Sequence, residues 1–262
     1  MQQVIRSAIT DIRTGFVLRR VWFALAAEDI GDQHRRTTLG PLWLLVNYLL
    51  FAGTFIFLFN PNPADHSYPI YVATGLLVWY YLMEALSLAA GLFQREESFI
   101  RGTTLPISVY VMRTALQCLI RAAYGLIGCV MILIMAGVAP NPAWLWALPG
   151  LALVVLVTPA MITIFAFAGA WFPDSQFLVG NFMRVGMFIT PVFWSGAGET
   201  GLRGALYYFN PFTYFLEIVR IPIVEGLMPH AAFALCAAIT LVAWALALYL
   251  LGRFRRQIAL IL

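Results

Sequence analysis

The sequence predicts an all-α integral membrane protein with six transmembrane helices. Hydrophobic residues make up 62% of the chain and charged residues only 11%, whereas a soluble domain carries about 25% charged residues. The alternating pattern of a membrane β-barrel is absent, so a helical bundle is expected. Six apolar runs are long enough to cross a bilayer: residues 41–59, 69–92, 115–138, 143–170, 178–194 and 231–251.

The distribution of arginine predicts the orientation in the membrane. All 16 basic residues are arginine, and twelve of them precede the first run, follow the second run or follow the last one. Cytoplasmic loops are enriched in Lys and Arg. Both termini are therefore expected in the cytoplasm, and the segment between the fifth and sixth runs is expected outside.

The chain is expected to form one domain, 1–262. It divides into an N-terminal cytoplasmic arm, 1–38, a six-helix bundle, 39–252, and a cytoplasmic tail, 253–262. In the arm, Leu18, Val21, Trp22 and Leu25 recur at helical spacing beside arginines. This pattern is typical of an amphipathic helix on the membrane surface. The alternative is a soluble arm that packs on another subunit.

The loop after the second run, 94–109, is charged and long enough for a short helix that projects into the cytoplasm. Glu96, Glu97 and Arg101 are candidates for coupling to a partner that supplies energy. The alternative is that they are ordinary solvated loop charges.

The segment 195–230 is too long for a turn and too apolar for a solvated loop. Two short helices, re-entrant or interfacial, are expected there, because non-helical backbone at membrane depth needs protein or water around it. Asn210 and Pro211 begin the second one. Glu217 and Arg220 are three residues apart, so they can pair on one helix face. We interpret these four residues as an exit gate, with a locally solvated ion pair as the alternative.

Several kinds of chemistry are excluded by composition. The chain has no lysine, so it lacks the lysine of a P-loop nucleotide site. If ATP is used, a separate subunit must bind the ATP and its Mg²⁺. The three cysteines lie in apolar runs without metal-site spacing, which indicates core packing. No metal site and no catalytic residue are expected.

Five motifs together resemble the membrane subunits of ABC-2 type exporters, in particular the permeases for O-antigen, capsule and teichoic-acid polysaccharides. They are RTTLGPLW at 36–43, ESFIRGTTLP at 97–106, TPVFW at 190–194, NPFTYFLEIVR at 210–220 and RFRR at 253–256. The resemblance covers nearly the whole chain, and it rests on the order and spacing of the motifs rather than on any one of them.

The resemblance implies a homodimer in the bacterial inner membrane with two copies of a separate ABC ATPase subunit. Its substrate would be a lipid-linked polysaccharide, with no nucleic acid as partner, and this chain would bind membrane lipid but no cofactor. It would accept an O-antigen-like glycan, linked to undecaprenyl diphosphate, on the cytoplasmic side. One alternative keeps the fold but exports a drug or a lipid. Another is a membrane-embedded lipid-phosphate enzyme, which would need clustered acidic or histidine residues.

Aromatic side chains could stack on the sugar rings of such a substrate. The alternative is an aromatic belt at the membrane interface. The candidates near the outer half of the bundle are Tyr71, Trp79, Phe188, Phe193, Trp194, Tyr207 and Tyr208, with Phe212 and Tyr214 beside them.

Two charges lie far from the ends of the apolar runs, namely Glu84 and Arg184. Arg184 has three possible roles: its side chain extends to the inner headgroups, it pairs with Glu84, or it contacts the phosphates of a lipid-linked substrate.

Overall fold

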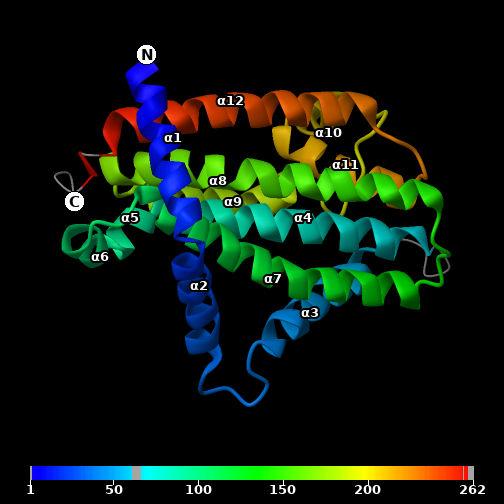
Figure 1. The fold of residues 1–262 in the computed structure, drawn as a ribbon. Coiled ribbons are helices and arrows are strands. Elements are labelled where there is room, and N and C mark those ends of the chain that lie inside the picture. Colours follow the sequence, from blue (N-terminus) through cyan, green and yellow to red (C-terminus); the bar gives the residue numbers. More distant parts are fainter. Residues whose placement is uncertain (1, 61–65, 256, 259–262) are drawn as a thin grey trace.

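The computed structural model describes residues 2–60, 66–255 and 257–258, and over these residues the fold is helical with no strand (Figure 1). This confirms the predicted fold class. The elements are α1 (Gln2–Val17), α2 (Arg19–His34), α3 (Leu42–Phe59), α4 (Ser67–Ala90), α5 (Leu92–Arg95), α6 (Glu97–Gly102), α7 (Ile107–Met135), the 3₁₀ helix η1 (Pro142–Trp146), α8 (Ala147–Trp171), α9 (Ser175–Ile189), α10 (Gly201–Tyr208), α11 (Pro211–Val224) and α12 (His230–Phe254).

Helix α4 forms the centre of the bundle, because it packs against α7, α8, α9 and α11. In the most apolar 18-residue stretch of α4, 72% of the residues are buried, compared with 11% in α3. Close contact with α8 depends on Gly169, where an added Cβ would overlap the carbonyl group of Ala90. Small residues let membrane helices approach in this way. Helix α3 lies at the edge of the bundle and slants away from it (Figure 1).

Within the described residues, five helical segments are long and apolar enough to cross a membrane: α3, α4, α7, η1 with α8, and α12. The predicted fifth run corresponds to α9, which has 15 residues and is about 22 Å long at 1.5 Å per residue. The six-span count therefore stays a prediction. It agrees with the path of the chain, because the N-terminal arm and the end of α12 lie at the same end of the bundle (Figure 1).

The largest differences between predicted and observed boundaries are at the end of α9 and the start of α7. Helix α9 ends at Ile189, before Thr190 and Pro191, because proline cannot donate a backbone hydrogen bond and disfavours helix in the residue before it. Helix α7 begins at Ile107, eight residues before the predicted start at 115. The apolar pattern is interrupted by Arg113. In the structure Arg113 pairs with Asp29 and Glu96 within the fold, so the helix includes it.

The N-terminal arm consists of α1 and α2, which cross the end of the bundle against α7 and α12 (Figure 1). Buried Asp11 fixes α1: its Oδ1 accepts a hydrogen bond from the Ser108 amide at 3.0 Å, and its Oδ2 lies 3.1 Å from Arg255. Trp22 of the predicted apolar stripe is buried. The arm is thus packed on its own chain, in the crosswise direction expected of a helix on the membrane surface.

Candidate functional site

At the C-terminal end of α9 the chain leaves the helix, and the carbonyl groups of this break all accept hydrogen bonds. After Ile189 the chain is non-helical. The carbonyls of Pro191 and Val192 accept hydrogen bonds from Arg220 at 2.8 and 3.0 Å. Those of Phe193 and Trp194 accept from the hydroxyls of Tyr68 and Tyr71, at 3.0 and 2.9 Å respectively. These bonds make an irregular backbone acceptable inside an apolar bundle. We call residues 190–194 the carbonyl segment.

Arg220 is buried, with 3% of its surface exposed. Its guanidinium lies over the ring of Tyr71, 3.7 Å from the centroid, in the geometry of a cation–π contact. Gly75 of α4 leaves the space for it, because an added Cβ would overlap Arg220 Nη2 and come within 2.9 Å of the Val192 carbonyl oxygen.

We expect Gly75→Ala to destabilise the protein by about 1–3 kcal/mol, because the added methyl group forces Arg220 out of a filled site. Gly53→Ala on α3 is the matched control, since nothing lies within 4 Å of a Cβ there. Thermal unfolding in detergent would compare the two variants. Equal melting temperatures would contradict the packing described here.

The two predicted short helices before the last span are α10 and α11. Helix α11 is packed against α4, α8, η1 and α12, so it lies within the bundle rather than on its surface. Asn210 caps it by accepting from the Phe212 amide at 3.0 Å, and Pro211 occupies the first turn. The Asn210 amide also donates to Thr190 Oγ1 at 2.8 Å. Asn210 therefore connects the start of α11 to the carbonyl segment.

The predicted pair of Glu217 and Arg220 does not form, and neither side chain is solvated. Glu217 is 8% exposed and accepts a hydrogen bond from the Tyr207 hydroxyl, while Arg220 is turned to the carbonyl segment. Burial raises the pKa of Glu217, although the Tyr207 hydrogen bond and the charge of Arg220 act in the opposite direction. Helical spacing would allow this pair, but Arg220 instead donates to the carbonyls of Pro191 and Val192. Glu217 instead fixes α10 to α11.

The aromatic residues predicted to line a conduit separate into three groups. Phe188 and Phe193 form one aromatic cluster with Phe55 and Phe59 of α3, with the rings of Phe55 and Phe193 stacked at 4.8 Å. Trp194 is close to this cluster, since its indole donates to the Phe188 carbonyl at 3.0 Å.

The second group consists of Tyr71, Tyr207 and Tyr208, and the third is Trp79, which lies in the core. Tyr71 donates to the carbonyl segment and Tyr207 to Glu217, while the neighbouring Tyr208 is half exposed. Trp79 is fully buried and meets the ring of Phe212 edge-on at 5.5 Å. Trp79 therefore has no face open to a substrate in this structure.

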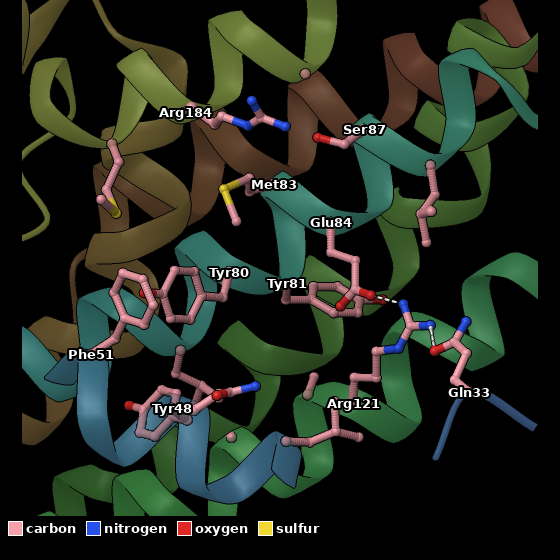
Figure 2. Close-up of a pocket in the computed structure, with 18 of the residues that line it drawn as sticks. Gln33, Tyr48, Phe51, Tyr80, Tyr81, Met83, Glu84, Ser87, Arg121 and Arg184 are labelled. Carbon is pink, nitrogen blue, oxygen red and sulfur yellow. Dashed lines mark hydrogen bonds and ion pairs between the residues drawn. The ribbon is translucent and has the colours of Figure 1, made fainter. Parts of the chain in front are cut away.

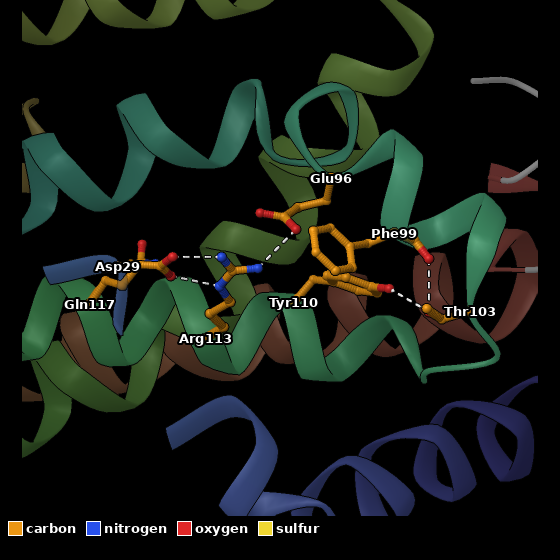
Figure 3. Close-up of polar contacts among 7 residues, drawn as sticks. All are labelled: Asp29, Glu96, Phe99, Thr103, Tyr110, Arg113 and Gln117. Atoms are coloured by element: carbon orange, nitrogen blue, oxygen red, sulfur yellow. Dashed lines mark hydrogen bonds and ion pairs between the residues drawn. The ribbon is translucent and has the colours of Figure 1, made fainter. Parts of the chain in front are cut away.

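At the other end of the bundle, the predicted helix in the charged loop is α6. Its Glu97 and Arg101 form an exposed pair at 3.2 Å. Glu96 instead turns inward to Arg113 of α7 at 2.9 Å, and Arg113 also holds Asp29 of α2 through two bonds of 2.7 Å (Figure 3). Gln117 donates to Asp29 as well. One arginine thus joins the N-terminal arm, the loop before α6 and a candidate span.

A cavity with a volume of about 1020 Å³ lies among α2, α3, α4, α7 and α9. Glu84 pairs in its wall with Arg121, whose Nη2 donates to Gln33 at 2.6 Å (Figure 2). The predicted Glu84–Arg184 pair is therefore wrong. Arg184 lies in the wall of the same cavity, on the opposite side from Arg121 (Figure 2).

Sequence reasoning missed the roles of Arg113 and Arg121, and it missed their partners Asp29 and Gln33. A helical-spacing search would have found part of the cavity, because Tyr80, Glu84 and Ser87 recur on one face of the second predicted span. The contacts of Arg113 with Asp29 span 84 residues, and no local pattern indicates them.

The described residues contain no group of three His, Cys, Asp or Glu side chains placed to hold a metal ion. Cys118, Cys129 and Cys236 are free and buried in the core, as predicted. The polar residues described above contact backbone groups, contact one another or line a cavity, within a helical domain that has five candidate membrane spans among its described residues.

Comparison with known proteins identifies the family. Residues 20–224 match the model of the ABC-2 type transporter family, and the chain belongs to that family. It is 24% identical to an O-antigen export system permease protein RfbA of Klebsiella pneumoniae, over 64% of this chain and 66% of that protein, just under two thirds of its length.

Two further relatives align over more of their length. An O-antigen export system permease protein RfbA of Myxococcus xanthus is 22% identical over 89% of this chain and 92% of its own. The polysialic acid transport protein KpsM of Escherichia coli is 20% identical over 83% of this chain and 85% of its own.

Proposed function

We propose that the chain is the membrane-spanning subunit of an ABC exporter that moves a lipid-linked, O-antigen-like polysaccharide from the cytoplasmic side across the bacterial inner membrane. The observation that carries this proposal is the alignment over 89% of the chain with an O-antigen export permease. The similarity to a polysialic acid transport protein supports the same substrate class. In this proposal both termini are cytoplasmic, as the arginine distribution predicts.

The exporter would contain two copies of this chain and two copies of a separate ATPase subunit that binds ATP and Mg²⁺. This chain would perform no bond chemistry. The exposed face of α6, with Glu97, Phe99 and Arg101, is our candidate contact with the ATPase. Helix α3 presents a largely uncovered apolar surface, which supports its packing against a second copy.

The path of the glycan would pass the aromatic cluster of Phe55, Phe59, Phe188 and Phe193. Phe59 and Phe188 are more than half exposed, and aromatic faces suit the apolar faces of sugar rings. The exit gate in this proposal consists of α10, α11 and the carbonyl segment.

The proposal is tested by purifying the chain with its ATPase subunit and reconstituting both in vesicles. We expect a lipid-linked glycan to stimulate ATP hydrolysis and to become accessible to a glycosidase on the opposite side of the membrane. The control is an ATPase subunit whose P-loop lysine is replaced, which should abolish transport. Transport of drugs or phospholipids without transport of the glycan would contradict the proposal.

A further inference from the structure

Helix α5 connects the end of α4 to α6, and it is packed into the fold although it has four residues. Leu92 and Phe93 are buried, and the ring of Phe93 meets Phe167 of α8 edge-on at 5.4 Å. Helix α6 lies at the end of the bundle and packs mainly against α5 (Figure 1), with Ile100 as its buried residue. A displacement of α6 would therefore reach the bundle through α5.

Gln94 joins α5 to the C-terminal end of α8. Its Nε2 donates to the carbonyl oxygen of Gly169 at 2.5 Å. Gly169 lies in the last turn of α8, where carbonyl groups have no amide donors within the helix. The Oε1 of the same side chain is buried and has no hydrogen-bond partner among the described residues. Because an open buried acceptor lowers stability, the connection to α8 explains this glutamine better than a contribution to stability does.

Arg95 joins α5 to the C-terminal end of α4. Its Nη2 donates to the carbonyl oxygen of Leu88 at 2.5 Å, in the last turn of α4. A cation is favourable there, because it faces the negative end of the helix dipole. Gly91 provides the room, since an added Cβ would lie 2.8 Å from Arg95 Nη1 and 2.9 Å from Gln176 Oε1 of α9.

The next residue, Glu96, makes a third connection. It pairs with Arg113 of α7, which also holds Asp29 of α2 (Figure 3). Three consecutive side chains thus join the segment before α6 to three candidate spans: Gln94 to α8, Arg95 to α4 and Glu96 to α7. The ends of these spans and the N-terminal arm are therefore tied to one short segment, which lies directly before α6.

We propose that Gln94 and Arg95 are positioning residues for energy coupling. They hold α5 to the ends of α8 and α4, so that a displacement of α6 by the ATPase subunit moves both ends together. The inference rests on the proposed function, in which α6 contacts the ATPase. In this role neither side chain needs to touch the substrate, because each acts through the backbone of a helix that crosses the membrane.

The test uses Gln94→Leu, and the double variant that adds Arg95→Leu, in the complex with the ATPase subunit in vesicles. Leucine fills a similar volume but cannot donate to Gly169, and it removes the open acceptor, so we expect no fall in melting temperature for Gln94→Leu. Glycan-stimulated ATP hydrolysis should fall about fivefold, the factor by which one hydrogen bond shifts a two-state equilibrium. Basal hydrolysis, which is the chemistry of the ATPase subunit, should be unchanged.

Two further variants complete the comparison. Arg95→Lys should keep part of the stimulation that Arg95→Leu loses, because an ammonium group can still donate to a carbonyl. Arg35→Leu is the control, since this arginine lies exposed just after α2, and it should behave like the wild type. Unchanged stimulation in the double variant would overturn the proposal. An equal loss of basal and stimulated hydrolysis with a lower melting temperature would also overturn it, because the two residues would then act in folding.

Hydrogen exchange follows the displacement itself. In the wild-type complex, ATP should change the exchange of α6 and of the last turns of α4 and α8, whereas in the double variant the change should stay within α5 and α6. A change in α4 and α8 that is absent from the wild type, or equal in the double variant, would overturn the proposal. If the wild type transports no glycan but the ATP-dependent change still requires Gln94 and Arg95, the proposed function is refuted and this inference stands.

Discussion

Replacing Arg220 by methionine is expected to abolish export and to lower the stability of the folded chain. The substitution leaves the Val192 carbonyl without a donor inside the bundle and the Pro191 carbonyl with only the Tyr71 hydroxyl, at 3.3 Å. Each unsatisfied buried group costs about 1–3 kcal/mol. Arg220→Lys should restore little, because an ammonium group lacks the planar fork that reaches two carbonyls while lying over Tyr71. The measurements are glycan transport in vesicles and thermal unfolding in detergent.

A charge exchange distinguishes this role from an ion pair. If Glu217 and Arg220 formed a pair, Glu217→Arg combined with Arg220→Glu would restore the function lost in each single variant. We expect no restoration, because the two side chains bind different partners. Restored transport in the double variant would show that our assignment of Arg220 is wrong. Arg35→Met is the control, since this arginine lies exposed just after α2, away from the proposed gate.

The second large effect is expected for Arg113→Met. The change leaves Asp29 and Glu96 without their shared cation, and both carboxylates are largely buried. Removing one partner of a buried ion pair costs on the order of 3 kcal/mol. Because Arg113 joins α2 and the loop before α6 to α7, we also expect glycan-stimulated ATP hydrolysis to fall at temperatures where the protein remains folded.

The matched control is the exposed pair on α6. Glu97→Gln and Arg101→Gln should change stability by less than about 0.5 kcal/mol. If α6 contacts the ATPase subunit, the double variant should nevertheless reduce stimulated hydrolysis. Normal stimulation in both this variant and Arg113→Met would exclude this end of the chain from coupling.

Much of the fold follows from local sequence. Apolar runs locate the long helices, and Asn210 followed by Pro211 marks the start of α11 through a cap and a favourable first turn. The end of α9 could also have been predicted from Pro191. These features depend on neighbouring residues in the chain, so their signals are local.

The partners of interior charges could not be predicted in this way. The i,i+3 spacing favours a Glu217–Arg220 pair, but the choice of partner depends on which buried acceptors lack donors. Those acceptors belong to residues 28 and 29 positions away from Arg220. For the same reason the sequence leaves a Glu84–Arg184 pair open, whereas the structure pairs Glu84 with Arg121 on α7.

The contact between Asp11 and Arg255 joins residues 244 positions apart and therefore has a consequence for biogenesis. The ribosome makes the first helix long before its partner at the end of α12 exists. Asp11 can meet Ser108 once α7 has been inserted, but its second oxygen has no partner until Arg255 has been made. Docking of the arm is thus completed only after α12 has been made, so chains truncated before Arg255 would keep an incompletely paired carboxylate.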